Sequence, residues 1–394
     1  MKKIIYYALF FYCAVLIAQQ SPTSAVLIEK SIKNKNSLVK NINFINIGPT
    51  IMSGRVADVD VNPDNTIEFY VGYASGGVWY TNNNGTTFSP VLDNSPTQNV
   101  GDIAVDWKTG TVWVGTGEKN SSRSSYAGIG VLKSSDKGKT WNNVGLLDAH
   151  HISRILINPN NADEVIIGVI GHLYSSNTER GVFKTSDGGK TWIKSLFIDE
   201  NTGIIDVAVA PENFNIMYAA SWERERKAWN FDGDGKNSAI YKSIDAGTSW
   251  TKIADNSGFP IGNGVGRIGL AVFNENTVYA LHDSQFRRPK DTNKKPSEGL
   301  TKGDFKTMST SVFLDLSDKK LNTYLKNNGF QEKYRAENVK QMVRVGSVKP
   351  IDLAKYLEDA NSMLFDTQVI GAEVFKTTNG GKSWKKTHDN FLDG

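Results

Sequence analysis

Four carboxylate side chains lie where acid–base chemistry is possible. Two stand at the start of apolar runs and two lie in long polar loops, and they are Asp102, Glu118, Asp206 and Glu223. Hydrolysis of a glycosidic bond uses two carboxyl groups about 5 to 9.5 Å apart, one of them with a raised pKa. A pair drawn from these four would therefore allow a glycoside hydrolase, whose substrate the sequence does not identify.

Other side chains in and beside the same loops suit binding. Aromatic rings stack on sugar rings and carboxylates bond sugar hydroxyls, and Trp222 and Trp229 have acidic neighbours. The candidate ligand contacts are Asp58, Arg154, His172, Trp222, Arg224 and His282. Our first hypothesis is therefore a binding protein for a glycan or a polypeptide. The alternatives are a glycoside hydrolase and a purely structural scaffold.

Several of these residues share a position when the apolar runs are aligned on the turn proline that ends them, or on Trp107 and Asn274 where that proline is absent. The aligned residues are Asp58, Asp102, Arg154, Asp206 and Gly269. Two interpretations stay open for such a ring of charges. It is either an ion-paired plug, because buried charges need partners, or a contact for an anion, a sugar or a metal.

One short segment has part of a calcium-binding pattern. Asn230, Asp232 and Asp234, followed by Gly235, have the ligand spacing of the first half of a calcium loop. Its twelfth position holds Tyr241, where such loops have glutamate. Calcium is therefore the one metal that the sequence suggests, and we expect no other cofactor.

The elements that must position these residues come from an internal repeat. One octapeptide, which we call a box, reads Ser/Thr-x-Asp/Asn-x-Gly-x-Thr/Ser-aromatic and occurs five times. Its central glycines, Gly85, Gly138, Gly189, Gly247 and Gly381, are separated by 53, 51, 58 and 134 residues. The acidic or amide side chain can bond backbone N–H groups two residues ahead, and glycine supplies the positive φ of a hairpin turn. The aromatic residue is expected to pack under the turn.

Each box follows a third short strand in a recurring series of four. Four antiparallel strands per repeat of this length are typical of a propeller blade. We therefore predict an all-β fold, a β-propeller of four-stranded antiparallel blades with five blades present, over residues 42–394. Because the fifth box lies close to the last residue, we expect an incomplete ring that further C-terminal blades of a longer chain complete. Alone, the five blades should associate through open edges.

The repeat also predicts which face carries function. Boxes and Asn-Pro turns should lie on one face, and the long loops 116–129, 221–239 and 282–372 on the other. The last of these contains a helical insertion, residues 287–369, in the fifth blade. We expect helices from Ser317 to Gly329, over 337–345 and over 350–364, after a loose tether over 287–303. The insertion either caps the loop face or only packs on the protein without a role in binding.

The N-terminus predicts export. Lys2 and Lys3 precede an apolar stretch that ends at Ala18, so residues 1–18 resemble a secretory signal and 19–41 a flexible linker. The protein should be extracellular or on the cell surface. Cys13, the single cysteine, lies in the signal, so no disulfide is expected. The remaining 43 basic and 41 acidic residues nearly cancel, which argues against nucleic acid as partner, and we expect no membrane span.

Beyond the boxes, several segments carry a family resemblance. They are Ile47-Gly-Pro, Gly54-Arg55-Val, Ala74-Ser-Gly-Gly-Val-Trp79, Gly115-Thr-Gly-Glu-Lys-Asn120, His150-His-Ile-Ser-Arg154, Gly171-His172-Leu, Glu179-Arg-Gly-Val182, Gly266-Arg-Ile-Gly-Leu270 and Tyr356-Leu-Glu-Asp-Ala-Asn361. The chain from Asn46 resembles secreted bacterial Asp-box propellers with sortilin-like, bacterial-neuraminidase-type (BNR) repeats, which are often labelled glycosyl hydrolases. The resemblance implies a longer protein with further blades, and sortilin-like relatives bind peptides.

Two enzyme groups with similar repeats have catalytic signatures that can be checked here. In xyloglucanase propellers an acidic residue precedes the Gly-Gly of the first blade, and this chain has Ser75 there. Sialidases have an arginine triad and a Phe/Tyr-Arg-Ile-Pro segment. This chain has Arg55, Arg154 and Arg267 near inner strands, but they are out of register and the segment is missing.

Overall fold

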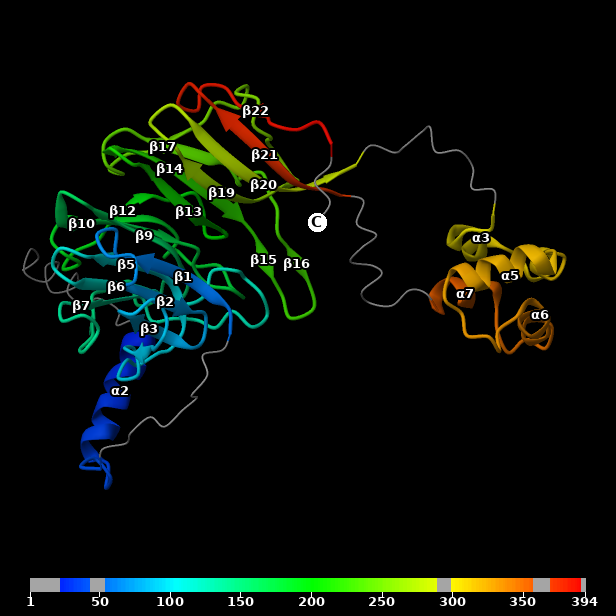
Figure 1. Ribbon diagram of the computed structural model, residues 1–394, viewed down its shortest axis with the longest axis horizontal. Helices are drawn as coiled ribbons and strands as arrows, with labels where there is room; N and C mark the ends of the chain where they lie inside the picture. The colour runs from blue at the N-terminus through cyan, green and yellow to red at the C-terminus, as the bar shows by residue number, and fades with distance from the viewer. Residues whose placement is uncertain (1–21, 43–53, 289–298, 357–368, 391–394) are drawn as a thin grey trace, which may run out of the picture. The chain divides into compact units, whose positions relative to one another are not determined.

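The computed structural model describes residues 22–42, 54–288, 299–356 and 369–390 (Figure 1). The predicted signal, residues 1–18, lies outside these ranges. The chain divides into two compact units, one formed by residues 1–286 with 370–394 and the other by 287–369. We describe each unit by itself.

Five antiparallel sheets, each of four strands in chain order, make up the described part of the larger unit. The first contains β1 (Val56–Val61), β2 (Phe69–Tyr73), β3 (Gly77–Thr81) and β4 (Ser89–Pro90). The second contains β5 (Val100–Asp106), β6 (Thr111–Thr116), β7 (Val131–Ser134) and β8 (Asn142–Asn143). The third contains β9 (Ile152–Asn158), β10 (Asn161–Val169), β11 (Gly181–Thr185) and β12 (Ile193–Leu196).

The fourth and fifth sheets carry longer connections. The fourth contains β13 (Thr202–Ala210), β14 (Asn213–Glu223), β17 (Ile240–Ser243) and β18 (Thr251–Lys252), with a two-stranded ribbon of β15 (Glu225–Arg226) and β16 (Phe231–Asp232) between β14 and β17. The fifth contains β19 (Val265–Val272), β20 (Val278–Arg287), β21 (Val369–Thr377) and β22 (Lys385–Lys386). The mostly-β prediction and the four-stranded antiparallel sheets are confirmed.

Successive sheets pack face to face through separate apolar clusters. The first and second sheets share a core around Tyr70 and Val100, and the second and third share one around Trp113 and Ile152. Two further clusters join the third sheet to the fourth and the fourth to the fifth. Burial of apolar area at each junction is therefore the main force that holds the sheets together.

The boxes fold as turns between the third and fourth strands of each sheet. In the second box, Gly138 has φ 89° and its N–H donates to Ser134 Oγ over 2.8 Å. The carboxylate of Asp136 accepts the N–H of Thr140 over 2.9 Å, four residues ahead and not two as the motif suggested. The turn needs this longer reach because the glycine lies between the two residues. The box tryptophan Trp192 also reaches the preceding sheet, where its indole N–H donates to the carbonyl of Val144 over 2.7 Å.

The smaller unit is helical and has its own apolar core. Its helices are α3 (Lys302–Thr307), α4 (Thr310–Leu314), α5 (Asp318–Asn327), α6 (Ala336–Arg344) and α7 (Pro350–Tyr356), packed around Phe305, Phe313 and Leu325. Ser317 caps α5, as the sequence predicts, because its hydroxyl accepts the N–H of Lys320. The tether expected over 287–303 instead includes the end of β20 and the start of α3. The predicted extension of the last helix to residue 364 lies outside the described residues.

The segment expected to be a flexible linker, residues 19–41, differs from the prediction. Its residues Pro22–Asn36 form helix α2, which the hydroxyl of Thr23 ties to Asp148 Oδ1 over 2.8 Å. Proline at the first position and the basic residues Lys33 and Lys35 in the last turn favour this helix. Among the described residues, no helix is long and apolar enough to cross a membrane.

Candidate ligand-binding face

The boxes and the long loops lie at opposite ends of the strands. The box residue Gly188 donates its N–H to Asp163, and Ala246 donates to Asn215, so boxes lie beside the turns that join the first two strands. The second-to-third connections lie at the other end, which we call the loop face. The arrangement of boxes and loops inferred from the repeat is the one the strands have.

Loops from sheets that are not neighbours meet on the loop face. Arg226 on β15, in the ribbon between β14 and β17, donates from Nε to the carbonyl of Ser121 in the second sheet's loop over 2.9 Å. Arg267 of the fifth sheet donates to Asn120 Oδ1 in the same loop, also over 2.9 Å. The loop over residues 117–130 therefore contacts both the β15–β16 ribbon and the fifth sheet, and a ligand on this face can touch several elements at once.

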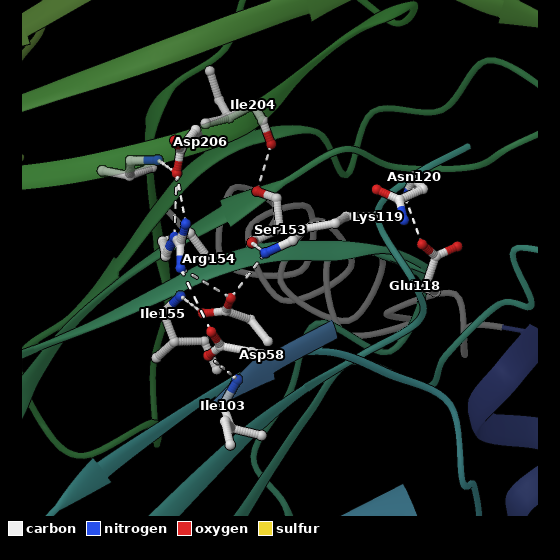
Figure 2. Close-up of polar contacts among 12 residues, drawn as sticks. Asp58, Ile103, Glu118, Lys119, Asn120, Ser153, Arg154, Ile155, Ile204 and Asp206 are labelled. Atoms are coloured by element: carbon white, nitrogen blue, oxygen red, sulfur yellow. Dashed lines mark hydrogen bonds and ion pairs between the residues drawn. The ribbon is translucent and has the colours of Figure 1, made fainter. Parts of the chain in front are cut away.

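The aligned charged residues form one cluster beneath these loops (Figure 2). Arg154 on β9 contacts Asp206 over 3.1 Å, Asp102 over 3.4 Å and Asp58 over 3.9 Å. Lys119 adds a second cation to Asp102 at 3.0 Å. The ion pairs of the first interpretation are present, and a contact of Asp58 or Arg154 with a ligand stays a prediction.

The same carboxylates also join adjacent innermost strands. Each accepts the backbone N–H of the residue that follows the aligned position in a neighbouring strand. The distances are 3.2 Å from Ile103 to Asp58, 2.7 Å from Ile155 to Asp102 and 2.8 Å from Leu270 to Asp206. These bonds show that the alignment on the turn residue gave the correct register, including Gly269, which was aligned through Asn274.

The environment of Asp102 shifts its ionisation. Burial raises the pKa of Asp102 to about 6, although Lys119 and Arg154 lower it. Its side chain is 1% exposed, so no substrate reaches it in this structure. A raised pKa is a property of catalytic acids, but here it comes with complete burial beneath the loops.

The other two catalytic candidates differ from each other. Glu118 is buried and pairs with Arg55 over 3.2 Å, while its carboxylate also accepts from Ser125 and from the N–H of Asn120. Glu223 is half-buried and accepts the N–H of Asn237 over 2.8 Å. Within the described ranges Glu223 forms no ion pair. Three of the four candidate acids are therefore neutralised by basic side chains.

Several residues predicted to touch a ligand are inside the protein instead. Trp222, Arg224 and His282 are buried, and His282 packs among Phe259 and Phe375. The indole N–H of Trp222 donates to Gly233 over 2.7 Å. Trp222 belongs to the apolar core between the fourth and fifth sheets, and Arg224 donates to the carbonyls of Leu173 and His172 instead of facing solvent. Asp58 and Arg154 keep some exposure, with side chains 20% and 33% exposed.

The histidines of the loop face are wholly or partly buried, and basic side chains lie near them. The ring of His172 stacks on His150 at 3.7 Å, and its nitrogens contact Asp148 and Ser175. Burial lowers the pKa of His150 to about 4 and that of His151 to about 3. Burial also lowers the pKa of Arg224 to about 9. His172 is therefore held by the protein and is less available to a ligand than predicted.

Exposed aromatic side chains on the loop face were only partly anticipated. Tyr126, Tyr174 and Trp229 are 57%, 55% and 83% exposed, and each lies in a connection at the loop end of its sheet. The two tyrosines were missed because a single aromatic residue in a loop gives no periodic signal. Loop length alone was the signal that could have found them.

The calcium pattern falls on the β15–β16 ribbon. The amide nitrogen of Asn230 lies 3.1 Å from both oxygens of Asp232, and Asp234 accepts the N–H of Gly264 over 2.8 Å. No cluster of three or more acidic, histidine or cysteine side chains able to hold a metal occurs in the described part of the chain. Calcium at Asn230, Asp232 and Asp234 stays a prediction.

Comparison with known proteins gives matches among solved structures. No protein-family model and no curated protein matches the chain. An ancestral GH74 enzyme is 18% identical over 62% of this chain and 32% of its own, with a TM-score of 0.44. The GH74 xyloglucanase from Xanthomonas campestris is 13% identical over 57% of this chain and 36% of its own, with a TM-score of 0.42. YCF48 bound to D1 peptide is 13% identical over 60% of this chain and 79% of its own, with a TM-score of 0.30. The chain thus spans about a third of the length of the two GH74 enzymes.

Proposed function

We propose that this protein is an exported β-propeller that recognises a glycan or a polypeptide through its loop face. The observation that carries the proposal is a contrast within that face. The acids suited to bond cleavage are mostly ion-paired and buried, whereas the loops above them expose Tyr126, Tyr174 and Trp229. Exposed aromatic side chains rimmed by polar groups are typical of binding sites.

The proposal includes further sheets that continue the ring. On β1, Val56 and Val59 are 53% and 45% exposed, although their register equivalents on β5, Val100 and Ile103, are buried at 0% and 3%. An apolar face of this kind gains stability when another sheet of the same repeat covers it. Export through residues 1–18 places the binding face outside the cell or on its surface.

A glycoside hydrolase is the second candidate, and one observation favours it. Glu223 is half-buried and free of any ion pair in the described ranges, so it could act as an acid or a base. The mechanism then needs a second carboxylate within about 5 to 9.5 Å. Glu118, Asp102 and Asp206 would each have to leave a basic partner first.

Binding and hydrolysis can be measured on the same samples. The full secreted chain is applied to an array of polysaccharides and peptides, and release of reducing ends is assayed for every polysaccharide that binds. We expect binding without release of reducing ends. Tyr126→Ala with Tyr174→Ala should weaken binding several-fold, because each ring lends apolar contact area to the face.

The matched control is Phe273→Ala, an aromatic residue 73% exposed in the β19–β20 turn on the box face. It should bind as the wild type does. Equal losses in the control and in the tyrosine variant would contradict the proposed face. Release of reducing ends that Glu223→Gln abolishes would establish the hydrolase instead.

A further inference from the structure

The strands β15 and β16 form a narrow ribbon (Figure 1), and Trp229 lies in the connection between them. The N–H of Lys227 donates to the carbonyl of Asn230 over 2.8 Å and closes a turn that contains Trp229. All nine tryptophans of the chain fall within the described residues, and Trp229 is the exposed one, at 83%. An indole exposed to this extent does not gain the stabilisation that burial would give, so its position suggests a role in binding rather than in stabilising the fold.

The base of the ribbon is anchored, so the tip is held in place. Arg226 lies 4.0 Å above the ring of Phe231 across the ribbon, and its Nε donates to Ser121 of the second sheet's loop. The indole N–H of Trp222 donates to Gly233 just beyond the ribbon. A partner that binds a fixed tip loses less free energy to ordering than one that must first organise a loop.

The surroundings of Trp229 favour a sugar over a protein partner. Its neighbours in the turn are the small Ala228 and the polar residues Lys227 and Asn230. A protein interface has a contiguous apolar core, which this tip does not offer in the described residues. A pyranose ring has an apolar face of C–H groups and a rim of hydroxyls, which matches one indole face surrounded by hydrogen-bonding groups.

Polar groups of the right kind flank the indole. The carboxylate of Asp232 faces the amide nitrogen of Asn230 at 3.1 Å, and Lys227 pairs with Glu225 at 3.2 Å. These groups are exposed at the tip, so their remaining donors and acceptors can bond hydroxyls. The tip thus provides both stacking and directional bonds.

We propose that Trp229 is a stacking platform for a pyranose unit of a neutral polysaccharide, with Asn230 and Asp232 as hydrogen-bonding groups. This rests on the proposed function and narrows its ligand to a glycan. The ribbon contacts the loop over 117–130 through Arg226 and Ser121, so a chain stacked on Trp229 lies beside that loop.

The test uses the full secreted chain and four soluble probes: xyloglucan, β-1,3-glucan, galactomannan and arabinoxylan. Affinity electrophoresis gives dissociation constants, and iodide quenching of tryptophan fluorescence reports chiefly on Trp229. At least one probe should bind and protect the fluorescence from iodide. Trp229→Ala should bind that probe about tenfold more weakly, and Trp229→Phe should lie between the two.

Two controls separate this inference from the proposed function. Phe273→Ala should leave binding unchanged, and circular dichroism should show that Trp229→Ala is folded, as expected for an exposed residue. If Trp229→Ala binds a probe as tightly as the wild type while the Tyr126 and Tyr174 variant does not, the platform is wrong and the binding face stands. If only peptides bind, and Trp229→Ala weakens them, the glycan assignment is wrong. Failure of every probe and peptide to bind overturns both.

Discussion

The first four sheets and the fifth sheet differ in the residues that their first two strands offer for packing against the next sheet. In each of the first four, the charged residue of the innermost strand pairs with a very small residue on the second strand. The pairs are Asp58 with Gly72, Asp102 with Gly115, Arg154 with Gly168, and Asp206 with Ala220. In the fifth sheet the sizes are exchanged, because Gly269 pairs with Leu281.

The small residues are required by packing and not by backbone conformation. A Cβ added to Gly115 would lie 2.4 Å from Ile152 Cγ2, and one added to Gly72 would lie 2.9 Å from Val100 Cγ1. At Gly269 an added Cβ meets nothing within 4 Å, and Leu281 is 53% exposed. A junction between two sheets therefore needs a small residue on the second strand, which leaves room for aliphatic side chains of the next sheet. It also needs a charged residue on the first strand, which bonds the first strand of the next sheet. The fifth sheet has neither.

The largest test of this difference removes the cation of the charged cluster. Arg154→Leu leaves Asp58, Asp102 and Asp206 without their shared partner, although Lys119 stays on Asp102. Losing one partner of a buried ion pair costs about 3 to 5 kcal/mol. Because Arg154 is one-third exposed, we expect the lower end, about 3 kcal/mol, in urea unfolding at neutral pH.

The pH dependence of the Arg154 variant has a definite sign. Arg154 lowers the pKa of Asp102, so its removal raises that pKa above its present value of about 6. A carboxyl group whose pKa is higher in the folded state stabilises the fold at low pH, and this contribution is lost as the pH rises through that pKa. The folded wild type and the folded variant both carry a protonated Asp102 below about pH 6, so the deficit of Arg154→Leu should grow as the pH rises above about 6. The control Gly269→Ala, at the same register position, should change stability by less than about 0.5 kcal/mol. Equal stabilities of the two variants would show that the charged cluster contributes nothing to this junction.

The part of the fold that could be predicted from the sequence is the part that repeats. Five boxes locate the sheets, and the turn residue after each first strand, which is a proline or else Trp107 or Asn274, gives the register of residues such as Asp102 and Arg154. Contacts between sheets could not be predicted in the same way. His282 is buried because Phe259 and Phe375, which come from distant segments, close around it. Helices α3 and α4 were missed because they are too short to show an apolar period.

A second test addresses the size of the small residue on the second strand. Gly115→Ala places a methyl group against Ile152. Overpacking of this kind usually destabilises a protein by 1 to 3 kcal/mol, so we expect the free energy of unfolding in urea to fall by about 2 kcal/mol. Leu281→Ala, at the matching position of the fifth sheet, removes a side chain that is already half exposed and should cost less than about 1 kcal/mol. Ile152→Ala should cost less in the Gly115→Ala background than in the wild type, because the two side chains compete for one space. Additive effects in this double-mutant cycle would mean that Gly115 does not make room for Ile152.

The smallest test asks whether the charged position acts through its hydrogen bond or its charge. Asp58 accepts the N–H of Ile103 over 3.2 Å, while its distance to Arg154 is 3.9 Å. Asp58→Asn keeps an oxygen acceptor and loses only the longer contact, so its free energy of unfolding should stay within about 0.5 kcal/mol of the wild type. Asp58→Ala leaves the N–H of Ile103 without its acceptor and should cost about 1 kcal/mol. If both variants lose the same stability, charge is what matters at this junction. Gly269 would then set the fifth sheet apart by its lack of charge rather than by its lack of an acceptor.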